Sequence, residues 1–283
     1  MRERSRNPRD RSNRERHQGR RVESESLRRQ GERLPGNCIY GVLPVTELLR
    51  ANPQRVESIT IAEGVREGRF GEIIELARTH GLIIKRSSRE AIDKMVEPGA
   101  NHQGVAAAAA AADYSPADEL FEGLDSQALT LVLDGVEDPR NFGAIVRTAE
   151  CAGVSSIFIP SRRAVGITQT VVKSSVGATE HVKIAKVANV NRLIEELKAR
   201  NVWVVGTAVE GAMDYTEWDW TQPTALVLGG EGRGLHRLVA ENCDALVKIP
   251  MYGTIESLNV SVAAGVILFE AQRQRRKTTN KVA

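Results

Sequence analysis

The sequence predicts an α/β protein of two domains, a small one followed by a larger one built on a mostly parallel sheet flanked by helices. From Leu129 onward, short β-rich apolar runs recur and helical patterns separate most of them, which is typical of parallel strands joined by crossover helices. Between Ile39 and Ala112, six helix-like and strand-like stretches alternate within roughly 70 residues. A length of 283 residues fits two modest domains plus tails.

Residues 1–34 are predicted to be a disordered, Arg-rich tail, because they contain few large apolar side chains to bury. Residues 1–33 hold twelve arginines and six acidic residues, a surplus of six positive charges. Since the whole chain carries a net charge of only +3, the remaining residues carry a net charge of about −3. Such an arm is either a solvated tail or an electrostatic contact to nucleic-acid phosphate.

Residues 35–112 are predicted to form the small α/β domain, and residues 113–126, with Ser115-Pro116 and acidic pairs, a linker. The expected elements of the small domain alternate in type along the chain: Val45–Arg50, Ser58–Ala62, Phe70–His80, Leu82–Lys85, Ser88–Val96 and Gly104–Ala109.

Residues 127–275 are predicted to form the larger domain, and residues 276–283 a basic tail. The expected strands are the β-rich apolar runs Leu129–Leu133, Ser156–Ile159, His181–Ala185, Val202–Thr207, Ala225–Leu228 and Ala245–Ile249. The expected helices are Gly143–Cys151, Asn191–Arg200 and Val260–Arg275. In a sheet of this kind, ligands bind beyond the carboxyl ends of the strands.

Composition favours a cytoplasmic protein without membrane association. No apolar run approaches the roughly 20 residues that a membrane-spanning helix needs, and the N-terminus has no secretory apolar core. The three cysteines lie far apart and have no metal-ligand spacing, so neither a disulfide framework nor a metal site is expected.

The first segment with candidate chemistry follows the run that ends at Leu133. It leads through the sequence DGVEDPRNFG to a helix that displays Arg147. Asn141 is suited to cap this helix, and Gly143 would let another segment or a ligand approach closely. Arg147 lies about one helical turn beyond Gly143 and could face the same end of the sheet as Asn141. A capped helix with a surface arginine would explain the same pattern.

The second segment, GGEGRGL at residues 229–235, places four glycines in six positions after a buried strand. Glycine weakens a regular element by up to about 1 kcal/mol, a cost that fits a place where backbone meets a ligand. A phosphate-binding loop is disfavoured, since neither a Gly-Lys-Ser/Thr ending nor a Gly-x-Gly-x-x-Gly pattern is present. A simple glycine-rich turn remains the alternative.

The third segment consists of IPMYG at residues 249–253 and SLNVSVAAG at residues 257–265. Asn259 precedes a long apolar helix, as a cap would. Small residues at Ser261, Ala264 and Gly265 allow this helix to pack closely against strands or against its counterpart in a second subunit. A capped core helix without further function is the alternative.

Together these segments resemble the three signature motifs of the SpoU (TrmH-like) family of RNA 2'-O-methyltransferases, within the SPOUT superfamily. The matching residues occur in family order: Asn141-x-Gly143 with Arg147, then LGGEGRGL at residues 228–235, then IPM at 249–251 leading to SLNVS at 257–261. Tyr40-Gly41 and the stretch NHQGV at 101–105 also resemble the family's small RNA-recognition domain. The resemblance covers residues 39–275.

The resemblance implies a trefoil-knotted C-terminal domain, a homodimer, S-adenosylmethionine as the methyl donor and no metal. Residues implied to hold the donor are Thr207, Gly229, Gly230, Ile249, Met251, Ser257 and Leu258. Those implied in catalysis are Arg147, Asn141, Glu231 and Asn259, and His102 and Gln103 would contact RNA. Because a guanidinium group holds its proton tightly, Arg147 is better suited to clamping phosphate and stabilising a developing alkoxide than to acting as a base.

The two-domain layout is most similar to the subfamily that methylates a guanosine in large-subunit (23S) ribosomal RNA. Methylation of transfer RNA and of antibiotic-resistance targets remain the alternatives within the family. A noncatalytic RNA-binding or ribosome-assembly factor of the same fold is the alternative from another class, although the intact set of Asn141, Arg147, Glu231 and Asn259 argues against it.

Overall fold

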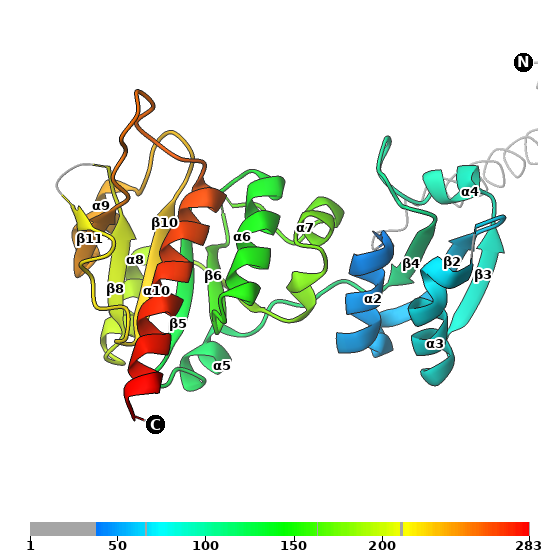
Figure 1. Cartoon of the computed structure of the whole chain (residues 1–283), viewed down its shortest axis with the longest axis horizontal. Helices are drawn as coiled ribbons and strands as arrows, with labels where there is room; N and C mark the ends of the chain where they lie inside the picture. The colour runs from blue at the N-terminus through cyan, green and yellow to red at the C-terminus, as the bar shows by residue number, and fades with distance from the viewer. Residues whose placement is uncertain (1–37, 66, 163, 210–211, 283) are drawn as a thin grey trace, which may run out of the picture. The chain divides into compact units, whose positions relative to one another are not determined.

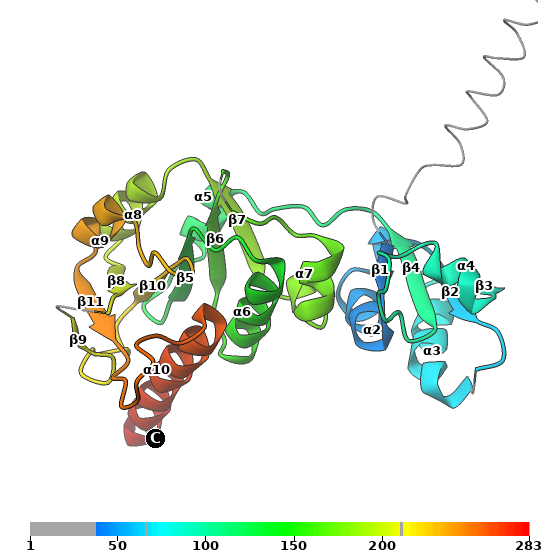
Figure 2. The ribbon, with the colours of Figure 1, turned by 90° about the horizontal axis from the view of Figure 1, so that it is seen from above.

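The computed structural model describes residues 38–65, 67–162, 164–209 and 212–282, so the expected tail at residues 1–34 lies outside the described residues. Residues Asn37–Ala283 group into one compact unit that contains two sheets, drawn in Figures 1 and 2. None of the described helices combines the length and apolarity needed to cross a bilayer.

The small domain is built on a four-stranded sheet in the order β1-β4-β2-β3. Its elements are β1 (Cys38–Tyr40), α2 (Val42–Ala51), η1 (Pro53–Arg55), β2 (Val56–Ala62), η2 (Glu67–Phe70), α3 (Gly71–Thr79), β3 (Ile83–Ser87), α4 (Arg89–Asp93) and β4 (Val105–Ala109). β4 pairs antiparallel with both β1 and β2, whereas β2 and β3 are parallel. All six expected elements are present.

Alternating side chains of this sheet form two small cores. On one face, Ile59 and Ile61 of β2 pack with apolar residues of α2 and α3 such as Leu48 and Ile73. On the other face, Tyr40 and Ala106 pack with Ile92 of α4. The alanine-rich run therefore supplies a central strand whose small side chains let helices approach closely.

The large domain is built on a seven-stranded sheet in the order β7-β6-β5-β10-β8-β11-β9, and every neighbouring pair is parallel. Its strands are β5 (Leu129–Asp134), β6 (Ser156–Pro160), β7 (Lys183–Val187), β8 (Trp203–Thr207), β9 (Met213–Asp214), β10 (Thr224–Gly229) and β11 (Ala245–Lys248). The central strands β5 and β10 are buried along their whole length, which explains their continuous apolar sequences.

Helices cover both faces of the large sheet, as Figure 2 shows. One face carries α6 (Pro139–Cys151), α7 (Gln169–Ser174) and α10 (Val260–Val282), and the other carries α5 (Ala117–Glu122), α8 (Val190–Lys198) and α9 (Arg237–Asn242). A short turn of helix, η3 (Ala178–Glu180), precedes β7. The predicted class, a mostly parallel sheet flanked by helices, is confirmed.

The largest differences from the sequence prediction concern three helices. α6 begins at Pro139, and its cap is Asp138, whose Oδ1 accepts hydrogen bonds from the backbone N–H groups of Arg140 and Asn141. Asn141 as the cap was therefore wrong: Asp followed by Pro is the stronger start signal, since proline is pre-organised for the first helical position. Within the expected linker, α5 forms because Leu120 and Phe121 are buried on the large sheet. The last helix continues past residue 275 to Val282.

Candidate active site

The carboxyl ends of four adjacent strands bring the candidate donor-binding residues to one edge of the large sheet. Gly229, at the end of β10, is in register with Asp134 at the end of β5. β8 pairs with β10 on its other side, and Thr207 at its end is in register with Val247 of β11. Ile249 follows β11 directly. Residues from three separate stretches thus share the edge where parallel sheets bind ligands.

One residue from each sequence motif joins a hydrogen-bonded cluster at this edge. The Asn141 side-chain amide donates to Glu231 Oε1. Nδ2 of Asn259 donates to Asn141 Oδ1 at 3.0 Å and lies 3.4 Å from Glu231 Oε1. The cluster joins the start of α6, the glycine-rich turn and the start of α10. The three motifs therefore meet at one place in the structure, as the sequence predicted.

The Asn259 amide is held in one orientation by the helix that it caps. Its Oδ1 accepts hydrogen bonds from the backbone N–H of Ser261 at 2.9 Å and from the Ser261 hydroxyl at 2.6 Å. Because the oxygen faces the helix, the NH₂ group faces Asn141 and Glu231. The expectation that Asn259 caps the last helix is confirmed.

Arg147 lies outside this cluster. It is exposed on α6, six residues beyond Asn141, a separation of about 9 Å along the helix axis. Among the described residues, none forms a hydrogen bond or ion pair with its guanidinium. The Arg147 guanidinium is therefore available to a bound ligand.

The glycine-rich turn is folded against protein backbone. A Cβ at Gly229 would lie 2.1 Å from the Gly234 carbonyl carbon, and a Cβ at Gly230 would lie 2.2 Å from the Gly135 oxygen. Gly232 and Gly234 have φ angles of +76° and +63°, which side-chain-bearing residues rarely adopt. The glycines thus let the turn close on itself and on the end of β5, while Glu231 projects into the cluster.

The segment after β11 provides exposed apolar surface beside this edge. Leu258 is 41% exposed, Ile255 is 76% exposed and Tyr252 is 97% exposed, whereas Ile249 is partly buried against the core. Ser257 is exposed and Met251 half-buried. Exposed apolar side chains beside polar ones fit an adenosine-like ligand, whose base is flat and apolar on its faces and polar at its edge.

Gly143 meets another segment of this chain. A Cβ there would lie 1.9 Å from Ser174 Oγ and 2.8 Å from the Val171 oxygen, both of α7. The close approach expected at Gly143 is therefore helix packing.

His102 is placed differently from the RNA contact that was expected. It is 6% exposed, its Nδ1 accepts a hydrogen bond from the Gly104 N–H at 3.1 Å, and its Nε2 lies 3.2 Å from Asp93 Oδ1. Both ring nitrogens bond to residues of the small domain, so an RNA contact by His102 stays a prediction that this geometry does not favour. Oε1 of Gln103 accepts the Val42 N–H at 2.9 Å, and no described residue bonds its amide NH₂.

Asp134 and His236 are the residues of this edge that sequence reasoning did not single out as functional. The Asp134 side chain is 6% exposed and forms two hydrogen bonds with His236, immediately after the glycine-rich turn. The available signal was an acidic residue at the end of the otherwise apolar strand LTLVLD. An unpaired carboxylate would be costly to bury there.

This combination of a parallel sheet and three converging motifs defines a methyltransferase of the SpoU class. Residues 128–269 match the SpoU rRNA Methylase family, and residues 38–115 match the family described as RNA 2'-O ribose methyltransferase substrate binding. The chain belongs to the SpoU rRNA methylase family.

Among its relatives, YacO of Bacillus subtilis, assigned to the TrmH family of tRNA/rRNA methyltransferases, is 43% identical over 84% of this chain and 95% of its own. The 23S rRNA (guanosine-2'-O-)-methyltransferase RlmB of Pseudomonas syringae is also 43% identical, over 84% of this chain and 95% of its own. The crystal structure of the SpoU methyltransferase AviRb from Streptomyces viridochromogenes, in complex with the cofactor AdoMet, aligns with a TM-score of 0.73 at 26% identity, covering 88% of this chain and 98% of AviRb.

Proposed function

We propose that this protein transfers a methyl group from S-adenosylmethionine to the ribose 2'-hydroxyl of a guanosine in 23S ribosomal RNA. The observation that carries the proposal is the cluster of Asn141, Glu231 and Asn259, which joins the three motifs at the carboxyl edge of the sheet. The target RNA follows from the similarity to the Pseudomonas syringae enzyme over nearly its full length.

The residues expected to hold the methyl donor have the chemistry that its adenosine part requires. Backbone at Gly229, Gly230 and Ile249 and the side chains of Thr207 and Met251 would surround its adenosine part, with Ser257 and Leu258 closing the other side. S-adenosylmethionine supplies an electrophilic methyl group on a sulfonium sulfur. The protein has to align the attacking oxygen with that methyl group and ease loss of the hydroxyl proton, and such orientation is worth several kcal/mol (about 7–11 in well-ordered cases).

The polar residues of the cluster are suited to orienting the ribose. The Glu231 carboxylate and the Asn141 amide lie together at the edge, where they can bond sugar hydroxyls. The exposed Arg147 guanidinium can clamp a phosphate and stabilise negative charge on the attacking oxygen. Action of Arg147 as a general base is the less favourable role, since an arginine rarely gives up its proton.

The small domain would bind the RNA substrate. Within the described part of the chain no residue bonds the side-chain NH₂ of Gln103, and the exposed basic residues Arg69 and Lys85 can contact phosphate. Arg55 is unsuited to that role because it forms an ion pair with the buried Glu180 carboxylate.

The family resemblance supports three further features of the proposal. We expect the segments after β10 and β11 to thread a trefoil knot, the chain to act as a homodimer, and the enzyme to work in the cytoplasm, where ribosomal RNA is exposed to it. Exposed apolar residues of α10, Val262 and Phe269, support the dimer.

The test is incubation of the purified protein with labelled donor and, separately, with 23S ribosomal RNA and transfer RNA, followed by mass mapping of the modified nucleoside. The expected product is one 2'-O-methylguanosine in 23S RNA. Label found only in transfer RNA would show that the substrate is transfer RNA and not 23S RNA. If calorimetry detected no donor binding at millimolar concentration, a noncatalytic RNA-binding protein would be favoured.

A further inference from the structure

The stretch Gly230–His236, which carries Glu231, is attached at both ends to one residue, Asp134. At its start, the backbone N–H of Gly230 donates to the Asp134 carbonyl oxygen at 2.8 Å. At its end, the backbone N–H of His236 donates to Asp134 Oδ2 at 2.8 Å. The stretch is thus closed into a loop whose base is the last residue of β5.

The His236 imidazole adds a second bond to the same carboxylate. Its Nδ1 lies 2.9 Å from Asp134 Oδ1, and Nδ1 is the donor because a carboxylate only accepts. The ring also lies against the backbone of Gly135, where a Cβ would come within 3.5 Å of the imidazole carbon Cε1.

Burial makes this pair strong. The Asp134 side chain is 6% exposed, whereas the His236 side chain is 57% exposed. Hydrogen bonds to a charged, desolvated group are about twice as strong as neutral ones, and a buried carboxylate that loses a donor is left under-satisfied. The exposed ring can therefore be replaced without opening the core, while its bond to Asp134 holds the loop.

We propose that His236 and Asp134 are a positioning pair that sets the glycine-rich loop in the geometry that binds the methyl donor and presents Glu231. The inference rests on the proposed function, since it concerns the same site. Neither residue is assigned a contact with the ribose or the methyl group; both act through the loop.

Two conservative replacements of His236 separate this role from a merely structural one. The amide nitrogen of Asn superimposes on Nδ1 and can restore the bond to Asp134, whereas that of Gln superimposes on Nε2 and cannot. We expect His236→Ala and His236→Gln to raise the donor dissociation constant about tenfold in calorimetry, and His236→Asn to stay within twofold of wild type. The KM for RNA should change less than twofold in all three.

His181→Ala is the matched control, because His181 also bonds a carboxylate, that of Glu47 at 2.8 Å, but lies outside the loop. It should bind the donor as wild type does, and thermal melting of every variant checks the fold. Wild-type affinity in His236→Ala, or equal loss in the Asn and Gln variants, would overturn the positioning role. Failure of wild-type protein to bind the donor would instead contradict the proposed function.

Discussion

At the scale of single residues, Arg147 is the side chain whose removal should separate chemistry from donor binding. It lies outside the Asn141 cluster, and no described residue pairs with it, so its fork would meet the RNA and not the donor. Arg147→Ala should lower the single-turnover methylation rate by about 100-fold or more, because one lost electrostatic donor typically costs that much. The donor dissociation constant should stay within twofold.

The matched control is Arg192→Ala, an exposed arginine on α8 that pairs with Glu196 on the opposite face of the sheet. It should leave both the rate and the donor affinity unchanged. Equal loss of rate and donor affinity in Arg147→Ala would contradict the assigned role.

The three cysteines should react with alkylating reagents at very different rates. Burial raises the pKa of the Cys38 thiol to about 11 and that of Cys243 to about 12; desolvation also raises the pKa of Cys151, but its side chain is exposed to reagents. At pH 8 only about one Cys38 thiol in a thousand would be ionised, and the thiolate is the reactive form. Mass spectrometry after brief iodoacetamide treatment should find Cys151 alone modified, with Cys38 and Cys243 reacting once denaturant is added.

Motif order in the sequence correctly predicted which distant residues meet, whereas burial could not be inferred from the sequence. Asn141, Glu231 and Asn259 were chosen from motif order, and they share hydrogen bonds. His102 stood in an equally suggestive motif but lies in the interior, since local sequence does not show what a chain packs against. Asp134 and His236 lie 102 residues apart in the sequence, so their contact likewise becomes visible only in the tertiary structure.

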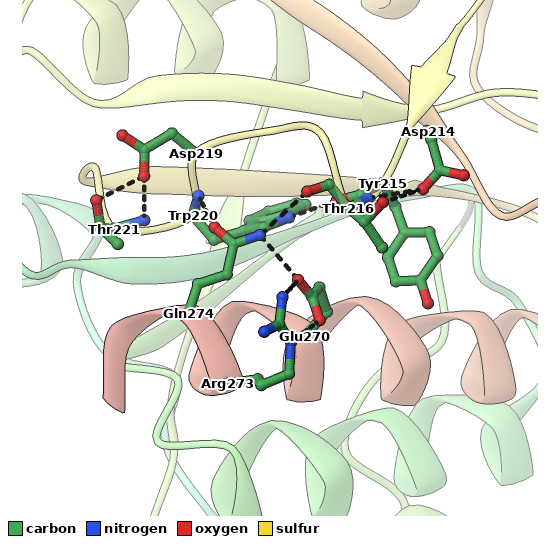
Figure 3. A network of polar contacts seen from close by, with 9 residues as sticks. All are labelled: Asp214, Tyr215, Thr216, Asp219, Trp220, Thr221, Glu270, Arg273 and Gln274. Atoms are coloured by element: carbon green, nitrogen blue, oxygen red, sulfur yellow. Dashed lines mark hydrogen bonds and ion pairs between the residues drawn. The ribbon is translucent and has the colours of Figure 1, made fainter. Parts of the chain in front are cut away.

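At the scale of elements, the last helix is attached to the sheet by polar contacts that no periodicity reveals. Figure 3 shows the loop after β9 lying along α10: Gln274 Oε1 accepts the Trp220 N–H at 3.1 Å, and Gln274 Nε2 donates to Glu270 at 2.8 Å. Glu270 also pairs with Arg273 at 2.6 Å. The bond between Gln274 and Trp220 joins α10 to the loop after β9.

Arg275 should contribute most to this attachment. Its guanidinium donates to the carbonyl oxygens of Gln127, Ala128, Trp220 and Gln222, and desolvation lowers its pKa. Arg275→Ala should reduce the free energy of unfolding by about 2 kcal/mol or more, because hydrogen bonds from a charged donor are lost together. Denaturant unfolding followed by circular dichroism would measure the change.

The neighbouring Arg276 is exposed and serves as the control. Arg276→Ala should change stability by less than about 0.5 kcal/mol. Equal effects of the two substitutions would mean that the carbonyl contacts of Arg275 add nothing to the attachment of α10.

Strands were easier to predict than helix ends. β5 and β10 are buried on both faces, so they appear in the sequence as continuous apolar runs. The ends predicted from these runs lie within one or two residues of the observed ends. α6 starts four residues before the predicted position, because its first turn carries polar residues of the site. Short helices such as α7 and α9 have too few residues for a period to be recognised.

At the scale of the whole molecule, the charge of residues 1–33 should matter for RNA affinity. Twelve arginines against six acidic residues make this segment positive, while the rest of the chain is slightly negative. Deleting residues 1–33 should weaken RNA binding at low salt and reduce the slope of log affinity against log salt, since fewer counterions are released. Filter binding across a salt series would measure this, and an unchanged slope would exclude a phosphate contact.

We expect two copies of the chain to assemble through α10. Val262 and Phe269 are 51% and 50% exposed and lie seven residues apart, on one side of α10. α10 also packs against α6, where Gly265 lies beside Thr148, one residue from Arg147. A dimer through this surface would cover the apolar side chains and bring Arg147 of one subunit toward the site of the other.

Phe269→Glu should therefore yield monomers in sedimentation velocity and lose methyl transfer with them, because a charge cannot be buried there without a partner. Leu238→Glu is the control, since Leu238 is 52% exposed on α9, which covers the opposite face. It should sediment as wild type does. A dimer that persists in Phe269→Glu, or one that dissociates in Leu238→Glu, would place the interface elsewhere.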